Sequence, residues 1–197
     1  MTTLYIIRHG KYLTPNGVIP YRLPGFHLAP EGIVMVGELS RKLGNVPLVA
    51  IYTSPMERTQ ETAEILAAPH GLVPVVDERL LEVRSPAQGL TVPEIEAITP
   101  FDWNIYDSDF RKAGNGETIE EVFLRTLDIV NEKLEQHKDK AFALVTHGDQ
   151  TMLMAAYYMG IPRTTEALLK LPYVPMAGGY RIELEADRAT VTPLHKI

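Results

Sequence analysis

Cysteine is absent from the 197 residues of this chain. Its absence excludes disulfide bonds, thiolate catalysis and cysteine metal sites, and makes a reducing cytoplasm the expected location. Long apolar runs are missing too: no stretch reaches the length that spans a bilayer. The opening residues, MTTLYIIRHG, lack the basic and apolar regions of a signal peptide. We therefore expect a cytoplasmic protein with no membrane partner.

Basic residues are fewer than acidic ones. The 19 lysines and arginines face 25 aspartates and glutamates, for a formal net charge of −6. A general attraction to nucleic acid or to an anionic membrane is therefore not expected, and any basic site must be local. The chain is 45% hydrophobic and 22% charged, which is typical of a globular protein. Its length predicts a single domain over residues 1–197 and leaves a homodimer open.

Short apolar runs alternate with amphipathic stretches. Buried strands are expected at Thr3–Ile7, Leu48–Ser54, Ala141–Asp149 and within VPVVDERLLE. Helices are expected at Pro30–Leu43, from Ser54 to about Ala68, from Thr118 onward and at Gln150–Met159, with two short ones between Leu90 and Phe110. A terminal hairpin is expected around a turn at Ala186–Arg188. This order predicts an α/β fold: a three-layer α/β/α sandwich with a mostly parallel central sheet.

Two helix starts carry a capping-box pattern. Ser54-Pro55-Met56-Glu57 places a serine three residues before a glutamate, with proline at the first helical position. Thr118 and Glu121 repeat the pattern before a long amphipathic stretch. We expect a helix to begin at each of these two places.

Three of the expected strands end in basic side chains. The first is followed by Arg8 and His9, the second by Arg58 in the first turn of its helix, and the third by His147. Ligands of open parallel sheets lie beyond the carboxyl ends of the strands, so these four side chains are expected to converge. Arginine forks suit phosphate oxygens, and a neutral imidazole is a nucleophile. In an acidic chain, such a cluster predicts a pocket for a small anion.

Phosphoryl transfer also needs a proton donor for the leaving alkoxide. Glu82, in RLLEVR just after another strand, is the candidate carboxyl group. Negative charge on a neighbouring phosphate should raise its pKa, as a general acid requires.

The segments IIRHG, SPMERTQETAEIL, RLLEV, NGETIEEVFLRTLDIV and VTHGD occur in this order. Together they resemble the histidine phosphatase superfamily, in its phosphoglycerate mutase-like branch, from Leu4 to about Gly160. The resemblance implies a phosphoglycerate mutase-like fold and a phosphohistidine cycle that uses no metal and no other cofactor. It implies that His9 is the nucleophile and Glu82 the proton donor, and that Arg8, Arg58 and His147 form the phosphate pocket.

Other positions depart from the family pattern. Lys11 stands where many members have an acid, Tyr12 replaces a small hydroxyl, and Asn16 falls one place late. Lys11, Asn16 and Arg22 are nevertheless our candidates for further substrate or phosphate contacts. A metal site built from His9, His27 and His147 is disfavoured, because the neighbouring arginines would repel a cation.

Several aromatic and polar residues have a simpler structural interpretation. Phe101, Trp103, Tyr106 and Phe110 are expected to form the core of the excursion before Thr118 rather than a cover over the pocket. Tyr21 and Tyr173 fit packing and substrate contact equally well. Glu117 and Thr118 are explained by the capping box, so we assign neither of them a role in the site.

The predicted activity is a phosphomonoesterase that acts on a small phosphorylated metabolite and releases inorganic phosphate. The alternative is a cofactor-dependent phosphoglycerate mutase. The short stretch between Glu82 and Thr118 favours the phosphatase, because mutases of this family usually carry extra segments there. A non-catalytic phosphate-binding module is a third interpretation, which the retained histidines and arginines make less attractive.

Overall fold

The computed structural model describes residues 1–185 and 188–196, and a six-stranded sheet lies at its centre. The strands are ordered β3-β2-β4-β1-β5-β6. They comprise β1 (Thr2–Arg8), β2 (Leu48–Thr53), β3 (Val75–Val76), β4 (Ala141–Thr146), β5 (Gly179–Glu185) and β6 (Arg188–Pro193). The first four in sequence are mutually parallel, whereas β5 and β6 are antiparallel additions beside β1. The predicted hairpin is confirmed, although its turn at 186–187 lies outside the described residues.

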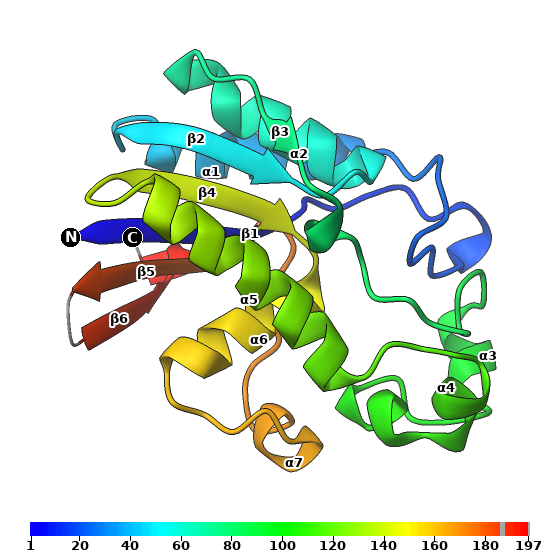
Figure 1. The fold of residues 1–197 in the computed structure, drawn as a ribbon. Helices are drawn as coiled ribbons and strands as arrows, with labels where there is room; N and C mark the ends of the chain where they lie inside the picture. Colours follow the sequence, from blue (N-terminus) through cyan, green and yellow to red (C-terminus); the bar gives the residue numbers. More distant parts are fainter. Residues whose placement is uncertain (186–187, 197) are drawn as a thin grey trace.

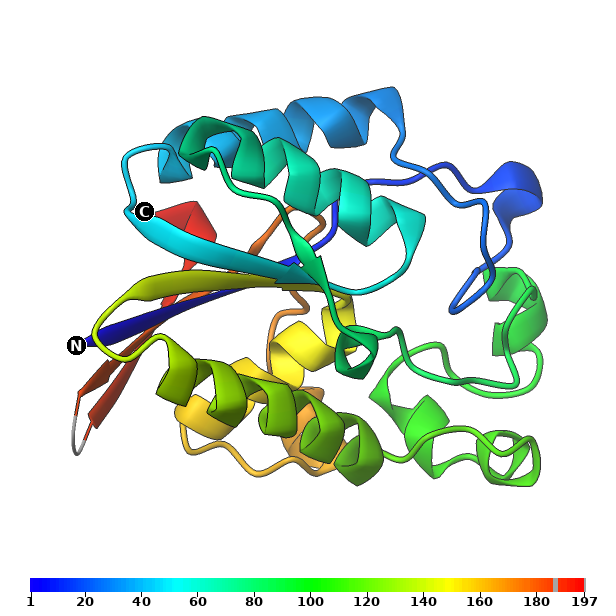
Figure 2. The same cartoon turned by 45° about the horizontal axis from the view of Figure 1, so that its top comes forward.

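Helices cover both faces of the sheet, so the three-layer sandwich is as predicted (Figures 1 and 2). Helices α1 (Pro30–Leu43) and α2 (Glu57–Ala67) lie over one face, and α5 (Ile119–Gln136) and α6 (Gly148–Tyr158) lie over the other. Successive residues of a strand point to opposite faces. In β1, Leu4 and Ile6 enter the core under α5 and α6, while Tyr5 and Ile7 enter the core under α1 and α2. A strand buried on both faces explains the continuous apolar run.

Short helices surround the end of the sheet at which the parallel strands finish (Figure 1). They are η1 (Pro15–Gly17), η3 (Glu78–Leu80), α3 (Val92–Glu96), η4 (Trp103–Asp107), α4 (Asp109–Ala113) and α7 (Thr165–Leu168). Two more single turns lie elsewhere, η2 (Ala68–His70) and η5 (Leu194–Lys196). The stretch expected to hold two short helices thus holds three, α3, η4 and α4. Within the described residues, no helix combines the length and apolarity that a membrane crossing needs.

The predicted capping box at Ser54 is wrong. Helix α2 begins at Glu57, its N-cap is Met56, and no side chain caps it. The Ser54 hydroxyl instead lies 2.9 Å from Nε2 of His147. The serine hydroxyl therefore bonds the residue that follows β4, and the helix begins three residues after Ser54.

The capping box before α5 is confirmed. The Thr118 hydroxyl accepts a hydrogen bond from the Glu121 amide at 3.1 Å, and the Glu121 carboxylate accepts one from the Thr118 amide at 2.7 Å. Glu117 takes no part in this box, so the structure separates two residues that we had explained together.

Candidate active site

The predicted convergence of strand ends follows from the register of the sheet. Arg8 is paired with Thr146 on the neighbouring β4, and Thr53 of β2 is paired with Val145. Backbone hydrogen bonds extend each ladder by one residue: the His9 amide donates to Thr146 O at 3.0 Å, and the Ser54 amide donates to Val145 O at 3.0 Å. The residues that leave β1, β2 and β4 therefore start side by side.

His9 is 2% exposed and is held as a neutral imidazole with one unprotonated nitrogen. Its Nδ1 lies 2.8 Å from the carbonyl oxygen of Gly10. Since a carbonyl can only accept, Nδ1 carries the proton and Nε2 keeps its lone pair. Burial, together with Arg58, His147 and Arg8, lowers the pKa of His9 well below its usual value. The site thus holds an unprotonated nitrogen ready to act as a nucleophile.

Gly10 lets the chain turn away closely after His9. A Cβ at this position would lie 2.7 Å from the side chain of Val36 and 3.1 Å from Gly32 O in α1. Any larger residue would push the turn off α1 and move the imidazole with it. The glycine of the RHG motif therefore has a steric reason.

Arg58 joins the two histidines. It is 1% exposed, and its Nε lies 3.4 Å from His9 Nε2 while its Nη2 lies 3.3 Å from His147 Nδ1. Nη2 donates to the carbonyl of Tyr21 at 2.8 Å. Nη1 is buried without a hydrogen-bond partner in the protein. A guanidinium with an unpaired N–H group beside this nitrogen can donate a hydrogen bond to a bound anion.

Arg8 offers a second unspent donor. Its Nη1 donates to Val174 O at 2.7 Å, and its guanidinium lies 5.2 Å from the ring centroid of Tyr173. Its Nε is buried without a partner in the protein. These contacts fix the Arg8 guanidinium while its Nε–H group stays available to a ligand.

His147 is fully buried, and the Glu82 carboxylate fixes its tautomer. Its Nδ1 lies 3.2 Å from Glu82 Oε2, and its Nε2 lies 2.9 Å from Ser54 Oγ. A carboxylate accepts, so Nδ1 carries the proton and Nε2 accepts from the serine hydroxyl. Burial lowers the pKa of His147 to about 4, and Arg58 adds to the shift against the opposing pull of Glu82. At neutral pH the ring is therefore a hydrogen-bond donor without charge.

Glu82 does reach the cluster, but its pKa contradicts our expectation for the site without phosphate. Burial acts to raise this pKa, yet His147, Arg58 and the Val83 N–H stabilise the anion and bring the net pKa below its usual range. The distances agree: Oε2 lies 3.8 Å from Arg58 Nη2, and Oε1 accepts from Val83 N at 2.8 Å. The raised pKa is therefore not a property of the site as the structure shows it.

A metal fits this cluster by spacing but not by charge. Ligand atoms of His9, Glu82 and His147 lie within 4.8 Å of one another. Arg58, however, stands 3.3 to 3.8 Å from one atom of each. A fixed cation at that distance opposes a second cation and favours an anion. His27, the third histidine of our disfavoured metal site, lies apart and pairs with Glu61 at 2.5 Å.

A cavity of about 520 Å³ opens above these residues. Arg8, His9, Arg58 and Glu82 form its floor, while His147 lies behind them. Its walls are mainly aromatic and aliphatic: Tyr12, Ile19, Pro20, Tyr21, Phe101, Trp103, Ile105, Tyr106, Leu169, Leu171, Tyr173 and Met176, with Asp102, Arg111 and Asp149 among them. The pocket therefore has a cationic end and an apolar end.

Comparison with known proteins decides the family. The family model of the histidine phosphatase superfamily (branch 1) matches residues 4–195. The chain belongs to this superfamily. The match covers almost the whole chain, further than the resemblance in the sequence motifs alone.

Curated relatives of this chain are distant. The uncharacterized protein Rv0525 of Mycobacterium tuberculosis is 38% identical over 81 residues, which are 41% of this chain and 40% of that protein. The matched region thus covers about two fifths of the length of this relative. The probable phosphoglycerate mutase GpmB of Yersinia pestis is 26% identical over 176 residues, 87% of this chain and 81% of that protein.

Solved structures confirm the fold of the superfamily. YhfR of Bacillus stearothermophilus superposes with a TM-score of 0.83 at 28% identity, over 98% of this chain and 96% of that one. The mycobacterial glucosyl-3-phosphoglycerate phosphatase Rv2419c superposes with a TM-score of 0.81 at 23% identity, over 96% of each chain. The phosphoglycerate mutase-like architecture predicted from the motifs is confirmed.

Three of the candidate residues lie outside the pocket wall. Lys11 is exposed, with its Nζ 4.0 Å from Glu31. Asn16 is exposed in η1 with a left-handed backbone (φ 60°). Arg22 bonds the carbonyl of Glu82 and the carboxylate of Glu117. The structure thus brings none of the three to the phosphate end.

The aromatic residues are the part of the site that sequence reasoning undervalued. The predicted core is confirmed for Trp103 and Tyr106, which are buried in a hydrophobic cluster, and for Phe110, which packs against it. Phe101 is exposed instead, and Phe101, Trp103 and Tyr106 also line the cavity. Tyr21 and Tyr173 line it as well. Aromatic spacing alone does not distinguish a core from a pocket wall, so no local signal could have settled this.

Asp149 was overlooked altogether. It stands in the first turn of α6 within the VTHGD motif, and its carboxylate accepts hydrogen bonds from the hydroxyls of Tyr106 and Tyr173. Tyr173 approaches so closely that a Cβ on Gly148 would lie 2.2 Å from its hydroxyl oxygen. The position of Asp149 two residues after His147 was the available signal.

Proposed function

We propose that this chain is a metal-independent phosphomonoesterase that works through a phosphohistidine on His9. The observation that carries the proposal is the lone pair on His9 Nε2, set beside buried N–H groups of Arg8 and Arg58 that have no partner in the protein. Three equatorial oxygens of a transferring phosphoryl group need such donors, and an in-line nucleophile needs such a lone pair.

The reaction has two displacements. His9 Nε2 attacks phosphorus, a P–N bond forms, and the ester P–O bond breaks. The leaving alkoxide takes a proton from the Glu82 carboxyl group. Water then attacks the phosphohistidine and gives its proton to the Glu82 carboxylate, so the P–N bond breaks and inorganic phosphate leaves.

Glu82 becomes an acid when the phosphate binds. In the resting site, Arg58 and His147 stabilise the carboxylate. A bound phosphate engages the same two groups and places negative charge beside Glu82, and both effects raise its pKa. The group is therefore protonated only in the complex, where its proton is used.

The apolar end of the cavity favours a leaving group that carries a ring and no second negative charge. Apart from Arg8 and Arg58 in the floor, the single cationic side chain among the described lining residues is Arg111. That guanidinium already donates to Glu117 O at 2.8 Å and lies 3.9 Å over the ring of Tyr106. Asp102 and Asp149 add negative charge to the same walls. A carboxylate on the substrate would meet repulsion there without a free partner.

A phosphoglycerate mutase is the second candidate. GpmB carries that name as a probable function, and it is 26% identical to this chain over 176 residues. A mutase must hold a phosphorylated carboxylic acid while the phosphoryl group returns, and the walls described above supply no spare cation for it. The name of the structural neighbour Rv2419c, a phosphatase, supports hydrolysis instead.

Phosphate release with a chelator present tests the proposal. The enzyme is incubated with phenyl phosphate and, separately, with 3-phosphoglycerate plus its bisphosphate, while phosphate and isomer are both assayed. We expect release from phenyl phosphate with a higher kcat/KM than from 3-phosphoglycerate, and a base-stable phosphoprotein in quenched samples. Isomerisation without release would favour the mutase, and no phosphoprotein under either condition would favour a binding module.

The Glu82→Gln variant should separate esters by their leaving groups. An alkoxide needs the proton and a nitrophenolate does not, so kcat/KM for an alkyl phosphate should fall about 10²–10³-fold. For 4-nitrophenyl phosphate it should fall less than about tenfold. Steady-state kinetics on the two esters check this. Equal slowing of both would remove Glu82 from the role of acid.

A further inference from the structure

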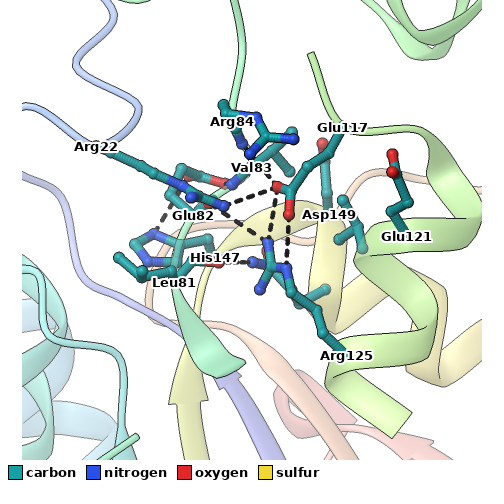
Figure 3. A network of polar contacts seen from close by, with 12 residues as sticks. Arg22, Leu81, Glu82, Val83, Arg84, Glu117, Glu121, Arg125, His147 and Asp149 are labelled. Carbon is teal, nitrogen blue, oxygen red and sulfur yellow. Dashed lines mark hydrogen bonds and ion pairs between the residues drawn. The ribbon is translucent and has the colours of Figure 1, made fainter. Parts of the chain in front are cut away.

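Glu117 is a buried carboxylate that the proposed chemistry does not use. It lies just before α5, is 7% exposed, and stands outside the cavity wall. Figure 3 shows it on the far side of the Glu82 loop, between Arg22, Arg84 and Arg125. Burying an anion is costly unless it is paired and hydrogen-bonded, so this position needs a reason.

The carboxylate of Glu117 is saturated with donors from three segments. Oε2 accepts from Arg22 Nη2 at 2.8 Å, from the Arg84 amide at 2.8 Å and from Arg125 Nη2 at 3.1 Å. Oε1 accepts from Arg125 Nε at 3.0 Å. Burial acts to raise its pKa, but these partners lower it on balance, so the group is an anion. It fixes two guanidinium groups that would otherwise repel each other.

Both guanidinium groups are aimed at one atom. Arg22 Nε donates to the carbonyl oxygen of Glu82 at 2.6 Å, and Arg125 Nη2 lies 3.4 Å from the same oxygen. Glu117 also holds the next turn of the loop, because its amide donates to Arg84 O at 2.9 Å. The backbone that carries Glu82 is therefore clamped from outside the cavity, while its carboxyl group points inward to His147 (Figure 3).

We infer that Glu117 is a positioning residue for Glu82, acting through Arg22 and Arg125. The inference rests on the proposed role of Glu82 as proton donor. A loop residue has no strand ladder to fix it, and η3 ends two residues earlier at Leu80. Proton transfer depends on hydrogen-bond distance, and a misplacement of about 1 Å can cost about 10²-fold in rate. Thr146 and Gln150 hold the carbonyls of Leu80 and Leu81, and the clamp extends this support to Glu82 itself.

The Glu117→Gln variant tests this inference. The amide keeps the shape but loses the charge and presents an NH₂ group to the arginines, so the clamp on Glu82 O loosens. We expect kcat/KM for an alkyl phosphate to fall about 30–100-fold and that for 4-nitrophenyl phosphate to fall less than about fivefold. In the double variant Glu82→Gln/Glu117→Gln, the second change should add almost nothing, because both act on one step.

Glu121→Gln is the matched control. This glutamate lies four residues further along and also serves main-chain N–H groups, but its partner is Thr118 of the capping box. It should lower the melting temperature and leave the ratio of the two esters unchanged.

The outcomes distinguish the inference from the function on which it rests. If Glu117→Gln slows both esters equally, Glu117 only supports the fold and the inference is overturned. If Glu82→Gln itself fails to separate the esters, the proposed acid is wrong. Should Glu117→Gln not fold, Arg22→Lys must show the same split between esters, since it keeps a cation for Glu117 but removes the Nε donor to Glu82 O. Equal slowing in that variant is a refutation as well.

Discussion

Replacing His9 with alanine should lower kcat/KM for every ester by at least about 10⁴-fold, the scale of losing a covalent nucleophile. The methyl group leaves no nitrogen near the phosphate, and no other described residue can take its place. His147 is buried behind Glu82 and Arg58, and its Nδ1 proton faces the carboxylate. The loss should therefore appear equally with good and poor leaving groups, unlike that in Glu82→Gln.

Two measurements identify the loss as chemical. Phosphoprotein trapped at alkaline pH should be present in the wild type and absent in His9→Ala. Added imidazole should restore part of the turnover, because the deleted ring leaves room beside Arg58 Nε. The control is His27→Ala, which removes an exposed histidine paired with Glu61 and should keep full activity. Phosphoprotein that persists in His9→Ala would place the nucleophile elsewhere.

The core of the site was predictable because parallel strands put their carboxyl ends together. Apolar runs located β1, β2 and β4, and the residues that follow each run were readable as Arg8, His9, Arg58 and His147. The register of the sheet brings these residues together, since Arg8 pairs with Thr146. No long-range information was needed beyond the assumption that these strands are neighbours.

The apolar end of the cavity was not predictable, because loops from distant parts of the chain build it. Tyr106 and Tyr173 meet on Asp149, and nothing in their local sequence signals the meeting. Of the two residues that depart from the family pattern after the RHG motif, Lys11 and Tyr12, only Tyr12 belongs to the cavity. An extended segment turns neighbouring side chains to opposite sides, so Tyr12 lines the cavity while Lys11 faces Glu31 outside.

Ser54 shows how a correct local pattern fails for a tertiary reason. Its spacing to Glu57 satisfies the capping-box rule, but the hydroxyl instead forms a hydrogen bond with Nε2 of His147. The same holds for Glu117, whose neighbour Thr118 caps α5 while Glu117 itself turns to the arginines. Functional demands override local rules here, and they do so at positions around the site.

The second large effect is expected for Arg58→Ala, with a loss of about 10²–10³-fold in kcat, or about 3–4 kcal/mol of transition-state stabilisation. Arg58 supplies the buried Nη1 donor and faces His9 Nε2 at 3.4 Å. Its removal leaves the equatorial phosphoryl oxygens short of a fixed charge at the moment that charge builds up. Arg41→Ala, at the exposed end of α1, is the control and should keep wild-type kinetics.

Stability should move in the opposite direction from activity. Arg58 is a desolvated cation, 1% exposed, with an unpartnered nitrogen and an ion pair to Glu82 that is long at 3.8 Å, so the buried pair costs folding free energy. Removing both charges in the double variant Arg58→Met/Glu82→Gln should therefore give a melting temperature at or above that of the wild type. Millimolar inorganic phosphate should raise the melting temperature of the wild type and leave that of Arg58→Met unchanged, because only the wild type binds it tightly. Near-native turnover in Arg58→Ala, or equal stabilisation of both proteins by phosphate, would show that the phosphate binds without this arginine.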